Sequence, residues 1–161
     1  MDSALLEGIA DAIQIYGDEA MPLRTEKSPR EIIVATLANL PDDVRHVLLS
    51  ERSLLFFTGT VWGCAFQLFF PRSDTDQQID GIFLASELWK SRISRKKAMS
   101  VVAHELGHVF LGHTRPDGAD AAKQEREADD FAERWGFSRS YPEYKPVKQP
   151  RRKRRRDRNA N

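Results

Sequence analysis

The sequence predicts an α+β fold: N-terminal helices up to about residue 52, a small, three-stranded, mostly antiparallel sheet within 53–90, and two helices within 94–136. Before residue 52 and again over 94–136, apolar residues recur at three- and four-residue steps, the spacing of helices that bury one face. Between these parts lie short runs rich in aromatic and β-branched residues, separated by Gly, Pro and polar residues, which is typical of strands.

Two helices and a shorter third are expected in the N-terminal part. Residues 2–16 have the pattern of an amphipathic helix. Its apolar face would comprise Leu5, Leu6, Ile9, Ile13 and Tyr16. A second helix is expected to begin at Ser28 as N-cap, with Pro29 in the first position and Glu31 completing a capping box. Pro41 ends that helix, and a short third helix follows it.

Residues 54–58, 65–70 and 79–85 are the three expected strands. They follow one another closely, with only Gly, Pro and polar residues between them. Because strands joined by short connections commonly pair as neighbours, these three predict a small, mostly antiparallel sheet.

The helix expected from Ser94 to about Gly112 carries the sequence His-Glu-Leu-Gly-His at 104–108. Side chains four residues apart lie on one face of a helix, so the imidazoles of His104 and His108 would point together, away from the apolar face. Glu105 lies one step round, near enough to reach a water molecule held there but not to be a third ligand. This H-E-x-x-H arrangement is typical of zinc peptidases: two ligands and a general base. The alternative is a pair of solvent-facing histidines on a surface helix.

A helix expected over about 119–135 supplies a third ligand. At 100° per residue, Glu125 falls on the same stripe as Ala128 and Ala132, which we expect to be buried. A buried carboxylate needs a cationic partner, and a zinc ion held by two histidines is such a partner. The alternative partner is an Arg of the core. Glu127 is expected to point elsewhere.

Asp129 lies one helical turn after Glu125 and is expected to hydrogen-bond the far nitrogen of a ligand histidine. A solvated helix Asp is the alternative. His113 does not have the spacing of a third histidine ligand, and on a continuous helix it would point away from His104 and His108. We therefore expect it to pack against the site or to support it rather than to bind the metal.

The last part of the chain differs in composition from the rest. Nine of the 25 Lys and Arg residues and one of the 24 Asp and Glu residues lie from Lys145 onward, which leaves positions 1–144 with an excess of seven acidic residues. We expect residues 1–141 to form one domain and 142–161 to be a disordered, Pro/Arg-rich basic tail. The 145–158 segment is expected to bind nucleic acid or an acidic partner, with a merely solubilising tail as the alternative.

A cytoplasmic location is expected from three features. Cys64 is the single cysteine, so an internal disulfide and a Cys-rich zinc site are both excluded. The first residues have no basic segment followed by an apolar run, as a signal peptide would have. No stretch of 18 apolar residues is present, so we expect no association with a membrane through a spanning helix.

The motif at 104–108, followed by Glu-Arg-Glu-Ala-Asp-Asp-Phe-Ala at 125–132, resembles the ImmA/IrrE-type zinc metallopeptidases of the gluzincin group. The resemblance covers about residues 30–137 and implies a zincin-like fold with Zn²⁺ as cofactor. It also implies that His104, His108 and Glu125 are the metal ligands and Glu105 the general base. Some members of that family cleave or inactivate a repressor-type transcription factor, so a regulatory protein is the expected kind of substrate.

Two functions therefore follow from the sequence. The first is a zinc metalloendopeptidase that hydrolyses peptide bonds of a protein or peptide substrate, with Tyr141 and Tyr144 among the candidates for stabilising the oxyanion. The alternative is a catalytically weak, zinc-stabilised interaction or regulatory protein whose basic tail binds nucleic acid. The presence of Glu105 favours the first, because a purely structural site needs no base.

Overall fold

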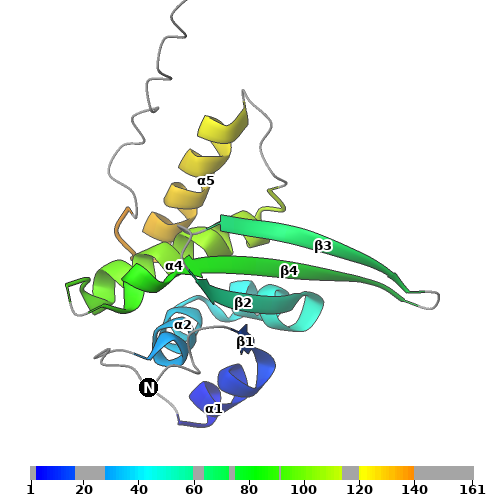
Figure 1. Cartoon of the computed structure of the whole chain (residues 1–161), viewed down its shortest axis with the longest axis horizontal. Coiled ribbons are helices and arrows are strands. Elements are labelled where there is room, and N and C mark those ends of the chain that lie inside the picture. The colour runs from blue at the N-terminus through cyan, green and yellow to red at the C-terminus, as the bar shows by residue number, and fades with distance from the viewer. Residues whose placement is uncertain are drawn as a thin grey trace, which may run out of the picture.

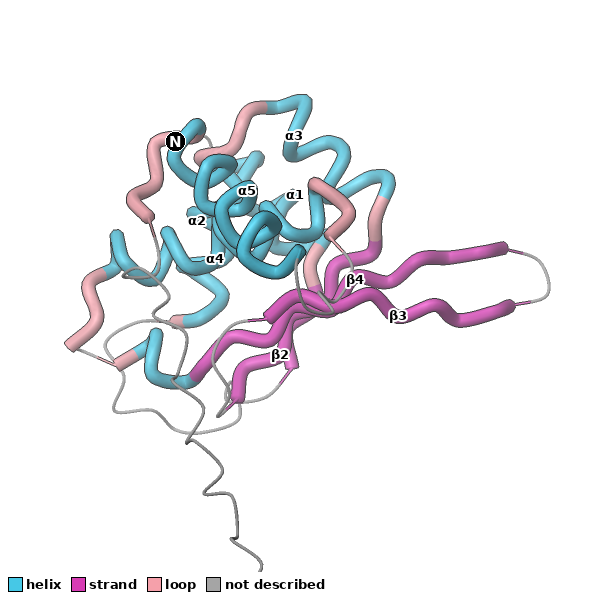
Figure 2. Tube along the Cα trace, turned by 90° about the horizontal axis from the view of Figure 1, so that it is seen from above, coloured by secondary structure: helices cyan, strands magenta, loops and turns pink. Residues whose placement is uncertain are grey.

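The structure is a computed structural model of the chain, and it describes residues 3–16, 28–59, 64–72, 75–90, 92–113 and 120–139. It contains both helices and strands, so the predicted α+β composition is confirmed. The helices lie on one side of the sheet, and the β3–β4 hairpin extends beyond the rest of the molecule (Figures 1 and 2). Tyr141, Tyr144 and the predicted basic tail fall outside the described residues.

The sheet has four strands in the order β1-β2-β4-β3. They are β1 (Gln14–Tyr16), β2 (Ser53–Gly59), β3 (Cys64–Arg72) and β4 (Thr75–Ala85). The β1–β2 and β2–β4 pairs are parallel, and only the β3–β4 pair is antiparallel. The expectation of three mostly antiparallel strands is therefore wrong, although all three predicted strands form.

The central position of β4 explains why the pairing differs from the expectation. Its Ile82 and Leu84 are fully buried, and so is Phe56, which pairs with Ile82 from β2. A strand with so much buried surface is best placed between two neighbours, so β4 lies between β2 and β3 and pairs with both. Composition indicates which segments are strands but not their order in the sheet.

The first strand interrupts the predicted helix over 2–16. That helix, α1, spans only Ser3–Ala12, and Gln14–Tyr16 pair in parallel with Leu55–Phe57. The Thr58 hydroxyl donates a hydrogen bond to the Tyr16 carbonyl oxygen at 3.3 Å, and the Tyr16 ring stacks on Phe57. Tyr16 was assigned to the helix because three residues are too few to reveal a strand period beside a longer helical pattern.

The other N-terminal helices are α2 (Pro29–Ala38), α3 (Asp42–His46) and a π-helical continuation, η2 (Val47–Glu51). Ser28 is the N-cap of α2 and Pro29 its first residue, as expected, but the Ser28 side chain makes no capping hydrogen bond, so the predicted capping box does not form. Ile32, Ile33 and Leu37 of this helix are almost completely buried.

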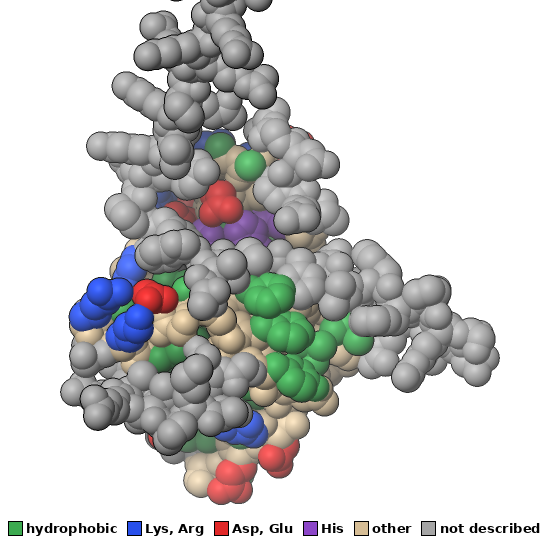
Figure 3. Space-filling view, in the orientation of Figure 1, with side chains coloured by type: hydrophobic (Ala, Val, Ile, Leu, Met, Phe, Trp, Pro, Cys, Tyr) green, Lys and Arg blue, Asp and Glu red, His purple; other side chains and the backbone are tan. Residues whose placement is uncertain are grey.

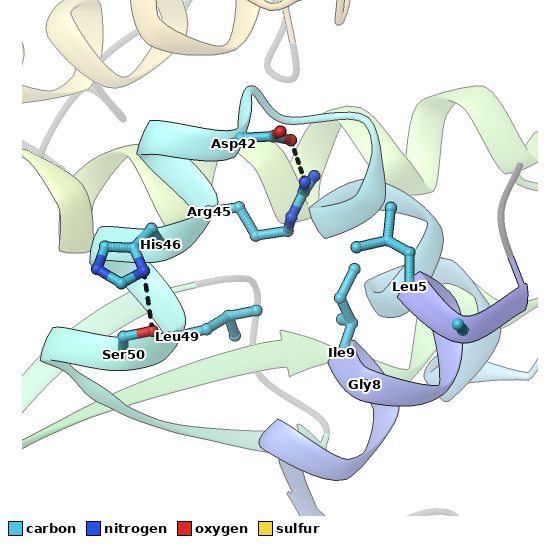
Figure 4. Close-up of a pocket in the computed structure, with 9 residues that line it drawn as sticks. Leu5, Gly8, Ile9, Asp42, Arg45, His46, Leu49 and Ser50 are labelled. Carbon is cyan, nitrogen blue, oxygen red and sulfur yellow. Dashed lines mark hydrogen bonds and ion pairs between the residues drawn. The ribbon is translucent and has the colours of Figure 1, made fainter.

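A cavity of about 340 Å³ lies between α1 and the α3–η2 segment. Its walls carry an ion pair between Arg45 and Asp42 and a contact of 3.2 Å between Ser50 Oγ and His46 Nδ1 (Figure 4). His46 is exposed and belongs to no metal-binding group among the described residues.

Two long helices complete the fold after a short 3-10 turn, η3 (Ser86–Trp89). Helix α4 (Arg95–Phe110) begins at Ser94, whose Oγ accepts a hydrogen bond from the Lys97 amide, and it contacts β3, β4, α2, η2 and α5. Helix α5 (Ala121–Arg134) packs along it. Among the described residues no helix has the length and apolar character needed to cross a membrane.

Candidate metal centre

Helix α4 places two imidazoles side by side. His104 and His108 are one turn apart, and their Nε2 atoms lie 3.1 Å from each other. The His104 side chain is 1% exposed, since it lies where α5 covers α4, while that of His108 is 12% exposed. The helical spacing predicted from the sequence therefore brings the two nitrogens to a single point.

Helix α5 brings Glu125 to the same point. Its Oε2 lies 3.2 Å from His104 Nε2, and its Oε1 lies 3.7 Å from His108 Nε2. Two ligand atoms that bind zinc at about 2.0–2.2 Å in a tetrahedral arrangement are separated by roughly 3.3–3.6 Å. The observed separations of 3.1, 3.2 and 3.7 Å, the last two measured to different oxygens of Glu125, lie on either side of this range. His104, His108 and Glu125 therefore form a group that could hold a metal ion.

Glu125 points toward the site as expected, but it is not buried as expected. Its side chain is 48% exposed and does not lie in a buried stripe, whereas Ala128 and Ala132 on the same face are fully buried. Helix α5 begins at the edge of the site and becomes buried only farther along, so helical phase gives the direction of Glu125 but not its depth. The alternative partner, an Arg of the core, is not among the contacts of Glu125 that the structure describes.

Glu105 and Asp129 both lie close to His104. The Glu105 side chain is buried, with 2% of the residue exposed, and its negative charge favours the protonated form of His104. Asp129 Oδ1 lies 2.9 Å from His104 Nδ1, the ring nitrogen on the far side from Glu125. The structure therefore places Asp129 where a hydrogen bond from His104 Nδ1–H would fix the orientation of the ring.

His113 lies beside His108, contrary to the expectation that it would point away. The chain leaves α4 through Gly112 at φ 67°, and the amides of His113 and Gly112 bond to the carbonyls of His108 and Val109. This is a Schellman ending, which turns the residue after the glycine back over the last helical turn. His113 Nδ1 consequently lies 2.9 Å from His108 Nδ1. Only the direction expected on a continuous helix was wrong, because α4 ends at Phe110; packing of His113 against the site is as expected.

The other side of the His113 ring faces α5. His113 Nε2 lies 3.2 Å from Glu127 Oε2, and Lys123 Nζ lies 3.7 Å from the other oxygen of Glu127. Glu127 was expected to point away from the site, and its described contacts do not include the ligand atoms. It is nevertheless linked to the site, because His113 contacts both Glu127 and His108. One feature of the sequence could have indicated this contact: Gly112, just before His113, is the kind of residue that ends a helix and reverses the chain.

The acid–base properties of the group show how a proton occupies it. Burial disfavours the charged form of His104, but the hydrogen bond with Glu125 and the nearby carboxylates outweigh burial and raise the pKa of His104. Burial and the charges of His104 and His113 lower the pKa of His108 to about 4. The hydrogen bond with His104 also lowers the pKa of Glu125. These opposite shifts favour placing a proton of the metal-free group on His104 rather than on His108.

The group is accessible from outside. Histidine side chains are visible at the surface below acidic side chains in Figure 3, and Glu125 is about half exposed.

Comparisons of the chain with models of protein families, with curated proteins and with solved structures find no match in any of the three. The resemblance to the ImmA/IrrE-type peptidases therefore rests on the two sequence motifs alone.

Proposed function

We propose that this protein is a zinc metalloendopeptidase with a zincin-like fold that hydrolyses a peptide bond of a protein substrate. The observation that carries the proposal is that His104 Nε2, His108 Nε2 and the Glu125 carboxylate come together at separations of 3.1–3.7 Å, close to those around a tetrahedral zinc ion. Hydrolytic zinc sites commonly use two His and one Glu and leave one position open, whereas structural sites are closed by four protein ligands. The half-exposed Glu125 fits an open site.

Zinc in this position would supply Lewis acidity toward water and toward the carbonyl oxygen of the scissile bond. Glu105 is the residue that we assign to proton transfer. Its carboxylate takes a proton from the attacking water, whose oxygen bonds to the carbonyl carbon, and delivers that proton to the amine nitrogen as the C–N bond breaks. The position of Glu105 beside His104, buried on the same helix, supports this assignment.

Asp129 supports the site by holding His104. With its proton on Nδ1, His104 donates to Asp129, which directs the Nε2 lone pair toward the metal position and fixes the plane of the ring. The resemblance to the ImmA/IrrE-type peptidases supports the same ligands and base, and through them a regulatory protein as the substrate.

The proposal is tested with the variant Glu105→Gln, which keeps the size of the side chain and removes the base. We expect one zinc per chain in both proteins by metal analysis, and cleavage of a peptide library by the wild type only. Glu133→Gln is the matched control, because Glu133 is an exposed residue of α5 whose described contact is Arg139. Equal cleavage by wild type and Glu105→Gln would overturn the assignment of Glu105. Zinc without any cleavage would favour the zinc-stabilised regulatory protein.

A further inference from the structure

His113 and Glu127 form a second chain of contacts that ends at the proposed metal site. His113 lies between His108 and Glu127, with its two ring nitrogens 2.9 Å from His108 Nδ1 and 3.2 Å from Glu127 Oε2. The side chains of His108 and His113 are 12% and 9% exposed, so water has little access to either ring. Buried ring nitrogens need partners, and these contacts provide them.

Only one arrangement of protons satisfies this chain when His108 presents Nε2 to a metal ion. His108 then carries its proton on Nδ1, and this N–H donates to His113 Nδ1. Because His113 Nδ1 is the acceptor, the proton of His113 is on Nε2, where it donates to the Glu127 carboxylate. Each N–H in the chain has an acceptor, and the carboxylate at its end can only accept.

The two histidines of the site are therefore supported in different ways. His104 donates directly to a carboxylate, Asp129, whereas the corresponding nitrogen of His108 contacts His113 and reaches a carboxylate, Glu127, through that third ring. Carboxylates that accept from ligand histidines fix the tautomer and the ring orientation and raise ligand basicity. We propose that His113 and Glu127 are positioning residues for His108, an inference that rests on the proposed metal site.

The backbone around this chain of contacts is arranged to hold it. The Schellman ending at Gly112 returns His113 over the last turn of α4, and the amide of His113 bonds to the carbonyl of His108 itself. Glu127 lies two residues after Glu125 on α5 and one turn after Lys123, which pairs with its second oxygen. Both helices thus contribute to the orientation of His108. Helical phase alone had Glu127 pointing away from the site, whereas its contact with His113 gives it a supporting role.

The test is zinc affinity, measured by competition with a chelator, for wild type, His113→Ala, Glu127→Ala and the double variant. Loss of such supporting contacts typically lowers metal affinity by about 10- to 100-fold. We expect the zinc affinity of each single variant to fall at least about 10-fold. The double variant should bind zinc no more weakly than the single variant with the lower affinity, because Glu127 acts through His113. Glu127→Gln, whose amide oxygen can still accept, should recover part of the loss.

Glu133→Ala is the control for removing one carboxylate from α5, and it should keep the wild-type affinity. Absorption spectra of the Co²⁺-substituted proteins should change for His113→Ala and Glu127→Ala but not for this control. Unchanged affinity in both single variants, or losses that add in the double variant, would overturn the inference. If His113→Ala does not fold, the comparison of Glu127→Ala with Glu127→Gln decides, since Glu127 is 42% exposed. Failure of the wild type to bind zinc would instead overturn the proposed metal site.

Discussion

Gly107 of α4 faces the carbonyl oxygen of Ala128 of α5 so closely that a Cβ atom at Gly107 would lie 3.2 Å from that oxygen. The same Cβ would lie 3.0 Å from the ring of Phe131. A residue without a side chain therefore lets the two helices approach at the point where α5 carries Glu125 and Asp129 toward His104. The weak helix former inside the motif is explained by this close approach of another backbone.

We predict that Gly107→Ala lowers both stability and zinc affinity. Alanine gains about 1 kcal/mol of helix propensity, but overpacking typically costs about 1–3 kcal/mol, and here a backbone carbonyl must move. The free energy of unfolding of the zinc-free protein should fall by about 1 kcal/mol, and zinc affinity should fall several-fold because α5 shifts with its carboxylates. Urea unfolding and chelator competition measure the two effects.

Gly8→Ala in α1 is the matched control for that substitution. A Cβ at Gly8 would meet nothing within 4 Å, so the variant should be stabilised by about 0.5–1 kcal/mol and bind zinc as the wild type does. If Gly107→Ala behaved like Gly8→Ala in both measurements, the close contact of α4 with α5 would not determine the geometry of the site.

Glu125→Ala is predicted to lose most of the zinc affinity while changing the zinc-free protein little. Its side chain is about half exposed, so its removal leaves no large cavity, and the buried His104 keeps Asp129 as a carboxylate partner. The stabilisation by zinc should therefore disappear: at a free zinc concentration of 100 times Kd it amounts to about 2.7 kcal/mol in the wild type. Melting temperatures with and without zinc measure this, and a large loss of stability in the zinc-free variant would contradict it.

The site could be predicted well because most of it is local to two helices. A four-residue step fixes the relation of His104 to His108, and helical phase selects Glu125 and Asp129. The missed part depends on where α4 ends. Gly112 adopts a positive φ and returns His113 to the site. A helical phase of 100° per residue does not apply beyond the end of the helix, so it could not predict this reversal of the chain.

The sheet was predicted less well for a related reason. Alternation and composition identify strands, but strand order depends on which strand buries most surface, and that depends on the helices that cover it. Ile82 and Leu84 make β4 central, and a three-residue strand at Gln14–Tyr16 adds a parallel edge that helical spacing concealed. Contacts between segments far apart in the chain decided both features.

The basic segment at 145–158 is predicted to act independently of the metal site. All the proposed ligands and positioning residues lie between His104 and Asp129, so deleting residues 145–161 should leave zinc affinity unchanged. We propose that the segment binds nucleic acid, in which case the deletion should abolish binding and the full chain should bind less tightly as salt rises, by counterion release. Filter binding at several salt concentrations measures it; equal binding by both chains would contradict it.

The final prediction concerns the proton that occupies the site without zinc. Carboxylate neighbours raise the pKa of His104, so the metal-free site holds its proton on His104, and zinc must displace that proton to bind Nε2. His108, with a pKa of about 4, carries no proton to displace at that pH. Any proton that zinc binding releases from this pair at pH 6.5 should therefore come from His104, so the release should not exceed about one proton.

The direction of the pH dependence follows from the same shifts. Below the pKa of His104, protons compete with zinc, so log affinity should rise with pH at a slope of about 1 and become flat once the pH exceeds that pKa. The slope should rise toward about 2 only below the pKa of His108, about 4. Calorimetric titrations in buffers of different ionisation enthalpy count the protons. In Asp129→Asn one of the carboxylates that raise the pKa of His104 is neutral, so the flat region should begin at a lower pH. Release of two protons at pH 6.5 would mean that His108 is protonated in the metal-free site, and the assignment of His104 as the only protonated ligand would be wrong.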